Sequence, residues 1–167
     1  MEMNYIIFFL AAIVPLFVGF FWYGPLFGNV WMKEMGFTKE NLKGGNIAIT
    51  LVLSYLFSLF IAFFLLPATI HQMGVYSTLA GEPGFSENTG QAYSYFLEFI
   101  ANYGDRFRTF KHGAIHGVLT SIFLVLPILA IIGMFERKSV KHVAINVGYW
   151  IITLAVMGGL VCQYGMV

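Results

Sequence analysis

Residues 46–66 read NIAITLVLSYLFSLFIAFFLL, a mostly apolar run that contains no Asp, Glu, Lys or Arg. The stretch without any of these charged residues extends further, from residue 44 to residue 81. A helix needs about 20 predominantly apolar residues to cross the hydrocarbon core of a bilayer. This part of the chain therefore predicts a membrane-spanning helix.

Three further blocks of the chain lack charged residues, namely residues 3–32, 112–135 and 142–167. Each block is long enough for one more span. Strands of a membrane barrel would instead show stretches of about ten residues with alternating polarity, and the sequence has none. We predict an all-α, polytopic membrane protein, a single four-helix domain over residues 1–167. The expected spans are residues 5–24, 46–66, 114–134 and 143–164.

The composition of the whole chain agrees with a membrane environment. Of its 167 residues, 59% are hydrophobic and only 10% are charged. An average soluble domain has about a quarter charged residues, so this chain cannot cover a water-facing surface. The net charge of +1 gives no reason to expect a nucleic acid as partner. The single cysteine, Cys162, excludes an intrachain disulfide.

The distribution of Lys and Arg predicts how the helices are oriented. The two short connections, after the first and after the third expected span, hold six of these residues, and the opposite side holds three. Cytoplasmic loops carry an excess of positive residues, so we expect these connections in the cytoplasm and both chain termini outside it. The six are Lys33, Lys39, Lys43, Arg137, Lys138 and Lys141, and the three are Arg106, Arg108 and Lys111.

The connection over residues 68–111 is too long for a simple turn, and such loops are often functional. Its apolar residues recur at the spacing of one helix face, which predicts a short amphipathic helix over residues 90–103 on the outer surface. We interpret this face as a contact surface for a partner or a second copy of the chain. The alternative is that the helix only lies on the bilayer or covers its own bundle. The contact residues are Tyr93, Phe96, Leu97, Ile100 and Tyr103.

Two local patterns add detail to this architecture. Within residues 31–42 (WMKEMGFTKENL) we expect a second short amphipathic helix on the cytoplasmic side, with Thr38 as an N-cap. Small residues recur at four-residue spacing in the spans, for example Gly113 and Gly117. Because lipid offers helices no hydrophobic reason to associate, this spacing predicts close backbone packing.

Three histidines and the cysteine are predicted to lie at one membrane level. His112 and His116 share a helix face at the outer start of the third span, His71 follows the second span, and Cys162 lies near the end of the fourth. Imidazole and thiolate are ligands for Zn²⁺ or copper, and Met73 is a further soft ligand. The alternative is that interfacial histidines only hydrogen-bond to water, lipid headgroups or loop carbonyls. The candidate metal ligands are His71, His112, His116 and Cys162.

The sequence offers no catalytic residues. Asp, Glu, Lys and Arg are missing from the expected spans, whereas proton relays and ion-coupled transporters usually keep at least one. Phosphate-binding loops and nucleophile elbows are also missing. We expect a non-catalytic protein without a resident cofactor, acting in the bilayer as an accessory or scaffold subunit beside other membrane subunits or copies of itself. The alternatives are a small homo-oligomeric transporter and a metal-binding membrane protein that uses the outer histidines.

Several short motifs carry a resemblance to a known family. They are FWYGPLFGNVW at residues 21–31, MGFT at 35–38, FKHG at 110–113, FERKS at 135–139 and NVGY at 146–149. Together they resemble the bacterial membrane family catalogued as domain of unknown function 1761, over nearly the whole chain. The resemblance implies a small four-helix protein of the bacterial inner membrane. It implies no established activity and no catalytic residues.

Overall fold

The structure, a computed structural model, describes residues 2–38, 40 and 46–166. This part of the chain contains four helices that are long and apolar enough to cross a membrane. It contains no strand, although an isolated antiparallel bridge pairs Met3 with Met166. The expected all-α fold with four span-length helices is therefore confirmed. The spans are Tyr5–Leu26, Ile47–Thr69, Phe110–Phe135 and Val140–Tyr164.

Two of the spans are interrupted beside prolines, which lack an N–H group and clash with the preceding turn. Pro15 follows a break in the first span and Pro25 lies in a π-helical turn. Pro127 is the second residue after another such turn. The first span is α1 (Tyr5–Ala11), α2 (Val14–Phe21) and the turn Trp22–Leu26. The third is α7 (Phe110–Thr120), the turn Ser121–Val125 and α8 (Leu126–Phe135), whereas α4 (Ile47–Thr69) and α9 (Val140–Tyr164) each form a continuous span.

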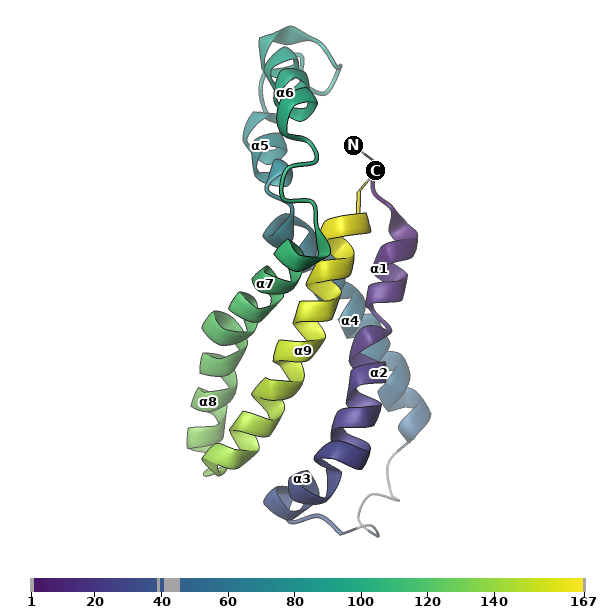
Figure 1. Ribbon diagram of the computed structural model, residues 1–167, viewed down its shortest axis with the longest axis vertical. Helices are drawn as coiled ribbons and strands as arrows, with labels where there is room; N and C mark the ends of the chain where they lie inside the picture. Colours follow the sequence, from purple (N-terminus) through teal and green to yellow (C-terminus); the bar gives the residue numbers. More distant parts are fainter. Residues whose placement is uncertain (1, 39, 41–45, 167) are drawn as a thin grey trace.

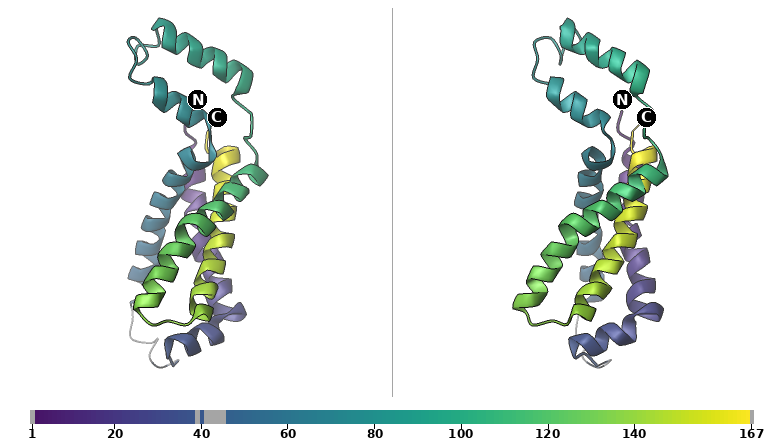
Figure 2. Two further views of the ribbon diagram at one scale, coloured as in Figure 1. Left: turned by 90° about the vertical axis from the view of Figure 1, so that its left-hand side faces the viewer. Right: turned by 60° about the vertical axis from the view of Figure 1, so that its left-hand side comes forward.

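Helix α9 lies at the centre of the bundle (Figure 1). It packs against α7 and α8 on one side and against α1 and α2 on the other, and it also contacts α4 (Figure 2). It is the most buried of the four spans. The remaining spans expose large apolar side chains along most of their length, as expected for helices that face lipid.

Glycines bring α7 and α9 into backbone contact. A Cβ atom at Gly113 would overlap the carbonyl group of Gly158, and one at Gly117 would overlap the carbonyl of Leu154. The four-residue spacing of these glycines is therefore a packing motif, as the sequence predicts. This contact fixes the N-terminal half of α7, which carries two of the candidate histidines.

A helical hairpin of α5 (Gln72–Leu79) and α6 (Gly90–Tyr103) projects beyond the bundle (Figures 1 and 2). Both chain termini lie at the same end, which we call the hairpin end. Helix α6 covers the expected residues, whereas α5 was not predicted from the sequence. The two helices pack through aromatic rings, with Phe96 of α6 against Tyr76 of α5 and against Phe85 of the connecting loop.

The short helix at the opposite end of the bundle differs from the expected one. Helix α3 spans Gly28–Met35 and ends at Gly36, whose φ of 70° is the left-handed conformation that commonly terminates helices. The prediction of a helix within residues 31–42 was therefore wrong in its boundaries. Thr38 follows the end of α3. Its expected role as an N-cap involves the residues that come after it, and of these residues 39, 41 and 42 lie outside the described residues.

Candidate metal centre

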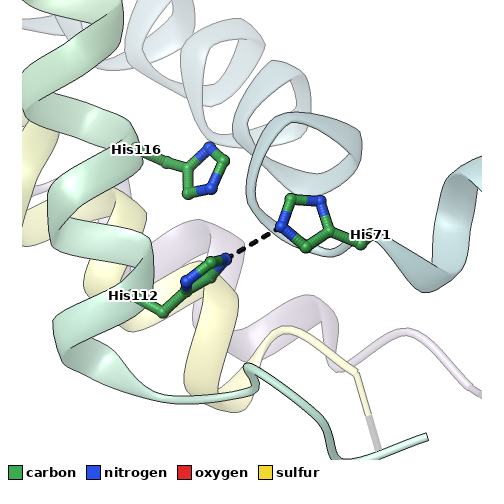
Figure 3. A group of neighbouring side chains, drawn as sticks. All are labelled: His71, His112 and His116. Carbon is green, nitrogen blue, oxygen red and sulfur yellow. Dashed lines mark hydrogen bonds between the residues drawn. The ribbon is translucent and has the colours of Figure 1, made fainter. Parts of the chain in front are cut away.

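His71 owes its position to the end of α4. The helix ends at Thr69, two residues after Pro67, and Ile70 adopts an extended conformation. Proline cannot donate to the helical ladder, and helices commonly stop near it. The chain therefore turns at residues 70–71 before α5 begins. His71 at this turn faces α7 (Figure 3).

His112 and His116 both lie within α7, on the face that points toward His71 (Figure 3). The helix begins at Phe110, four residues before the expected start of the span. Thr109 explains the earlier start, because its side chain caps the helix by accepting a hydrogen bond from the backbone N–H of His112, at 3.2 Å. The two histidines therefore share one face of a regular α-helix, as the sequence predicts.

The three imidazoles converge. One ring nitrogen from each of His71, His112 and His116 lies within 4.8 Å of the others. The Nε2 atoms of His71 and His112 are 3.0 Å apart. Nitrogens bound to one tetrahedral Zn²⁺ at normal bond lengths lie roughly 3.3 Å apart, so this pair needs only a slight adjustment to bind one ion. His71 is exposed and the other two histidines are half-buried, which leaves the cluster accessible.

Cys162 does not join this cluster in the structure. Its side chain is fully buried, and the single S–H of the thiol is within donating distance of two carbonyl oxygens, those of Thr69, at 3.5 Å, and of Phe107, at 3.4 Å. Met73 packs against the hydrophobic core. Of the predicted ligands, only the three histidines come together. The cysteine instead links α9 to the end of α4 and to the connection over residues 103–109.

The connection between α6 and α7, residues 103–109, is held at several points. The two N–H groups of Gln72 Nε2 are shared among the carbonyl oxygens of Tyr103, Gly104 and Arg106, which lie at 2.7, 3.0 and 3.0 Å. The guanidinium of Arg108 donates to the carbonyl oxygens of two residues near the C-terminus, Cys162 and Met166. These bonds link the connection to α5 and to the end of α9.

Phe107 lies on this connection and covers the histidines. Its φ of 66° is unfavourable for a bulky residue and persists only where the surroundings impose it. The phenyl ring stacks on His112, with centroids 5.1 Å apart, and meets the ring of His71 nearly edge-on at 6.1 Å. No sequence pattern pointed to Phe107, Gln72 or Arg108, because their roles depend on contacts with distant backbone.

A cavity of about 290 Å³ adjoins the histidine cluster. Arg106 lies in its wall, with the guanidinium over the rings of Tyr103 and Phe107, at 5.7 and 5.4 Å from their centroids. The cavity therefore combines a cation, aromatic walls and one member of the cluster. Its lining residues are His71, Gln72, Phe99, Tyr103, Arg106 and Phe107.

The predicted contact face of α6 is divided between the hairpin interior and its surface. Phe96 is buried and Tyr93 is half-buried, each packed against Phe85. Ile100 is half-buried, whereas Leu97 and Tyr103 are exposed. The prediction that all five residues form one outward apolar patch is therefore corrected, because α5 and the connecting loop cover part of that face.

Comparison with known proteins identifies a family and no activity. No curated protein and no solved structure matches this chain significantly. The motifs around Trp22, His112 and Asn146 fall within the stretch that matches a family model. That match covers residues 6–162, nearly the whole chain, and the chain therefore belongs to the family described as "Protein of unknown function (DUF1761)".

Proposed function

We propose that this protein binds a transition-metal ion, Zn²⁺ or copper, through His71, His112 and His116. The observation that carries the proposal is the convergence of three ring nitrogens within 4.8 Å, from two segments more than forty residues apart. Imidazole is a preferred ligand of both metals. Three protein ligands leave one coordination position for water or another molecule, as in zinc sites that bind small molecules.

The surroundings of the cluster also favour metal binding over simple hydrogen bonding. His71 and His112 can share one proton between their Nε2 atoms. The ring of His116 has no hydrogen-bond partner among the described residues, although it lies 5.1 Å from the ring of His71 and 4.5 Å from that of His112. One metal ion would use a nitrogen from all three rings at once.

The proposed setting is the inner membrane of a bacterium, with the hairpin end outside the cytoplasm. The excess of Lys and Arg near the opposite end supports this orientation. His71 directly follows one span and His112 lies at the start of another, so the metal would be held at the outer membrane surface. We assign no reaction to the protein. Its proposed role is to hold the ion.

Metal analysis of the purified full-length protein tests this function. Wild-type protein in mild detergent, loaded with Zn²⁺ and freed of excess metal, should retain about one ion per chain, and His112→Ala plus His116→Ala should retain almost none. His142→Ala is the matched control. This histidine lies at the opposite end of the bundle, where Nε2 is 3.0 Å from Asn146 Nδ2, and its loss should leave the zinc content unchanged. Equal zinc in the wild type and the double variant would overturn the proposal.

A role as an accessory subunit is a second candidate, supported by the surface of the hairpin. Tyr95 and Leu97 of α6 are each at least half exposed, on a unit that extends beyond the bundle. Exposed aromatic and apolar residues of this kind are common in protein interfaces. A photo-reactive residue at position 97 should cross-link to a neighbouring chain in native membranes. The same residue at the buried position 96 is the control and should cross-link within the chain only.

A further inference from the structure

We infer that the cavity beside the histidine cluster binds a small hydroxycarboxylate, with Arg106 pairing with the carboxylate and the metal completing the site. This inference rests on the proposed metal-binding function and specifies what occupies the coordination position that three histidines leave open. Charge, cavity shape and an unpaired buried acceptor support it.

The charge around the cluster favours an anion. A divalent ion on three neutral imidazoles adds two positive charges, and Arg106, Arg108 and Lys111 follow one another within six residues. Among the described residues, the one ion pair joins Lys141 to Glu34, at the far end of the bundle. None of the three cations near the cluster is paired with a described carboxylate. A bound anion would offset this accumulated charge.

Arg106 is the cation placed to receive that anion. Its guanidinium lies over two aromatic rings of the cavity wall, and the side chain is exposed. A guanidinium offers a planar pair of N–H donors that matches the two oxygens of a carboxylate. Arg108, in contrast, already donates to the carbonyl oxygens of Cys162 and Met166. Lys111 lines a different hollow on α7.

The walls and size of the cavity favour a small organic molecule over an inorganic ion. Three of the lining residues, Phe99, Tyr103 and Phe107, are aromatic and would contact a carbon skeleton. The volume of about 290 Å³ is at the lower limit of typical small-molecule pockets. A carboxylate with only a few carbon atoms meets both conditions.

Gln72 adds a preference for a hydroxyl group. Its side chain is only 3% exposed, and its amide orientation is set by the three carbonyl oxygens that accept from Nε2. Oε1 is buried and has no hydrogen-bond partner among the described residues. An unpaired buried acceptor is costly. Gln72 lines the cavity, and a small movement of its side chain that brings Oε1 to the cavity wall would let a hydroxyl donor there remove that cost. A 2-hydroxycarboxylate supplies such a donor next to its carboxylate.

Cobalt substitution makes the inference testable, because the visible spectrum of Co²⁺ reports its coordination. Adding lactate to the Co²⁺-loaded full-length protein should change the spectrum, while propionate, which lacks the hydroxyl, should act only at a roughly tenfold higher concentration. Inorganic phosphate should change the Co²⁺ spectrum only at higher concentrations than lactate does. By linkage, lactate should also raise the affinity for Co²⁺.

Two variants that each remove one positive charge test whether Arg106 binds the carboxylate. Arg106→Gln should bind Co²⁺ without lactate at least as well as the wild type, but need roughly tenfold more lactate for the spectral change. Lys111→Gln removes the same charge outside the cavity and should raise the lactate requirement far less than Arg106→Gln does. Co²⁺ binding with no lactate response, an equal response to propionate or phosphate, or an unaltered response of Arg106→Gln would each overturn the inference alone. Failure of the wild type to bind Co²⁺ would overturn the proposed function, and this inference with it.

Discussion

The Nε2 atoms of His71 and His112 lie 3.0 Å apart, although 41 residues separate them in the chain. The intervening segment forms the α5–α6 hairpin and returns to the same level of the bundle (Figure 2). Two structural features determine this proximity. The chain turns after Thr69, and the contact of Gly113 with Gly158 holds the start of α7 against α9.

Acid should release the metal. Protons and metal ions compete for the same imidazole nitrogens, so affinity falls as pH falls. Lowering the pH from about 7.5 to about 5 should release most of the bound Zn²⁺ into a chelating indicator, and returning to the higher pH should restore binding. Tight retention of zinc at the lower pH would contradict a site made of three histidines.

Cys162→Ala should leave the metal content unchanged. The thiol donates to the carbonyl oxygens of Thr69 and Phe107 and lies outside the histidine cluster. Its loss should lower the stability by about 1 kcal/mol through the lost hydrogen bonds and packing. Zinc content and thermal unfolding, measured on the same preparation, separate the two effects. A large loss of zinc with an intact fold would make Cys162 a ligand.

Gly117→Ala should destabilise the bundle. The added methyl group would overlap the backbone of Leu154 and force α7 away from α9, with an expected loss of about 1–3 kcal/mol. Thermal unfolding in detergent measures this effect. Gly74→Ala is the control, because nothing lies within 4 Å of a Cβ atom there, and it should not lower the stability. Equal stability of the two variants would show that α7 and α9 do not depend on this contact.

The orientation can be tested with single cysteines in a Cys162→Ala background. Ser86 lies in the loop of the hairpin and Glu136 at the opposite end, and both are exposed. In intact cells a membrane-impermeant thiol reagent should label Ser86→Cys and spare Glu136→Cys, because positive residues concentrate near Glu136. Opening the cells should make both reactive. Labelling of Glu136→Cys alone in intact cells would reverse the proposed topology.

The sequence predicted helices well where one strong local pattern was present. Helix α6 covers the expected residues 90–103 because its apolar residues recur at helical spacing. Helix α5 was missed because its residues, QMGVYSTL, mix small, polar and apolar side chains without a clear face. The third span begins earlier than expected because Thr109 caps it through a hydrogen bond that no hydropathy pattern records.

The candidate site was predicted only in part, for a physical reason. Spacing along one helix places His112 and His116 on the same face whatever surrounds them. The expected depth in the membrane, in contrast, is the same for all side chains at one level. It does not determine the direction in which each side chain points. Cys162 lies near the histidines in depth, yet its thiol is directed at the carbonyl oxygens of Thr69 and Phe107.

By itself the sequence determined that four helices form and where they run, because burying some twenty apolar residues in lipid is a property of each segment alone. The tertiary structure decided which side chains meet. The positions of His71, Phe107 and Arg106 around one cavity depend on backbone contacts between α7 and α9 and on the hydrogen bonds that Gln72 donates to the 103–109 connection. Such contacts join residues that are distant in the chain, so local hydropathy and residue spacing do not predict them.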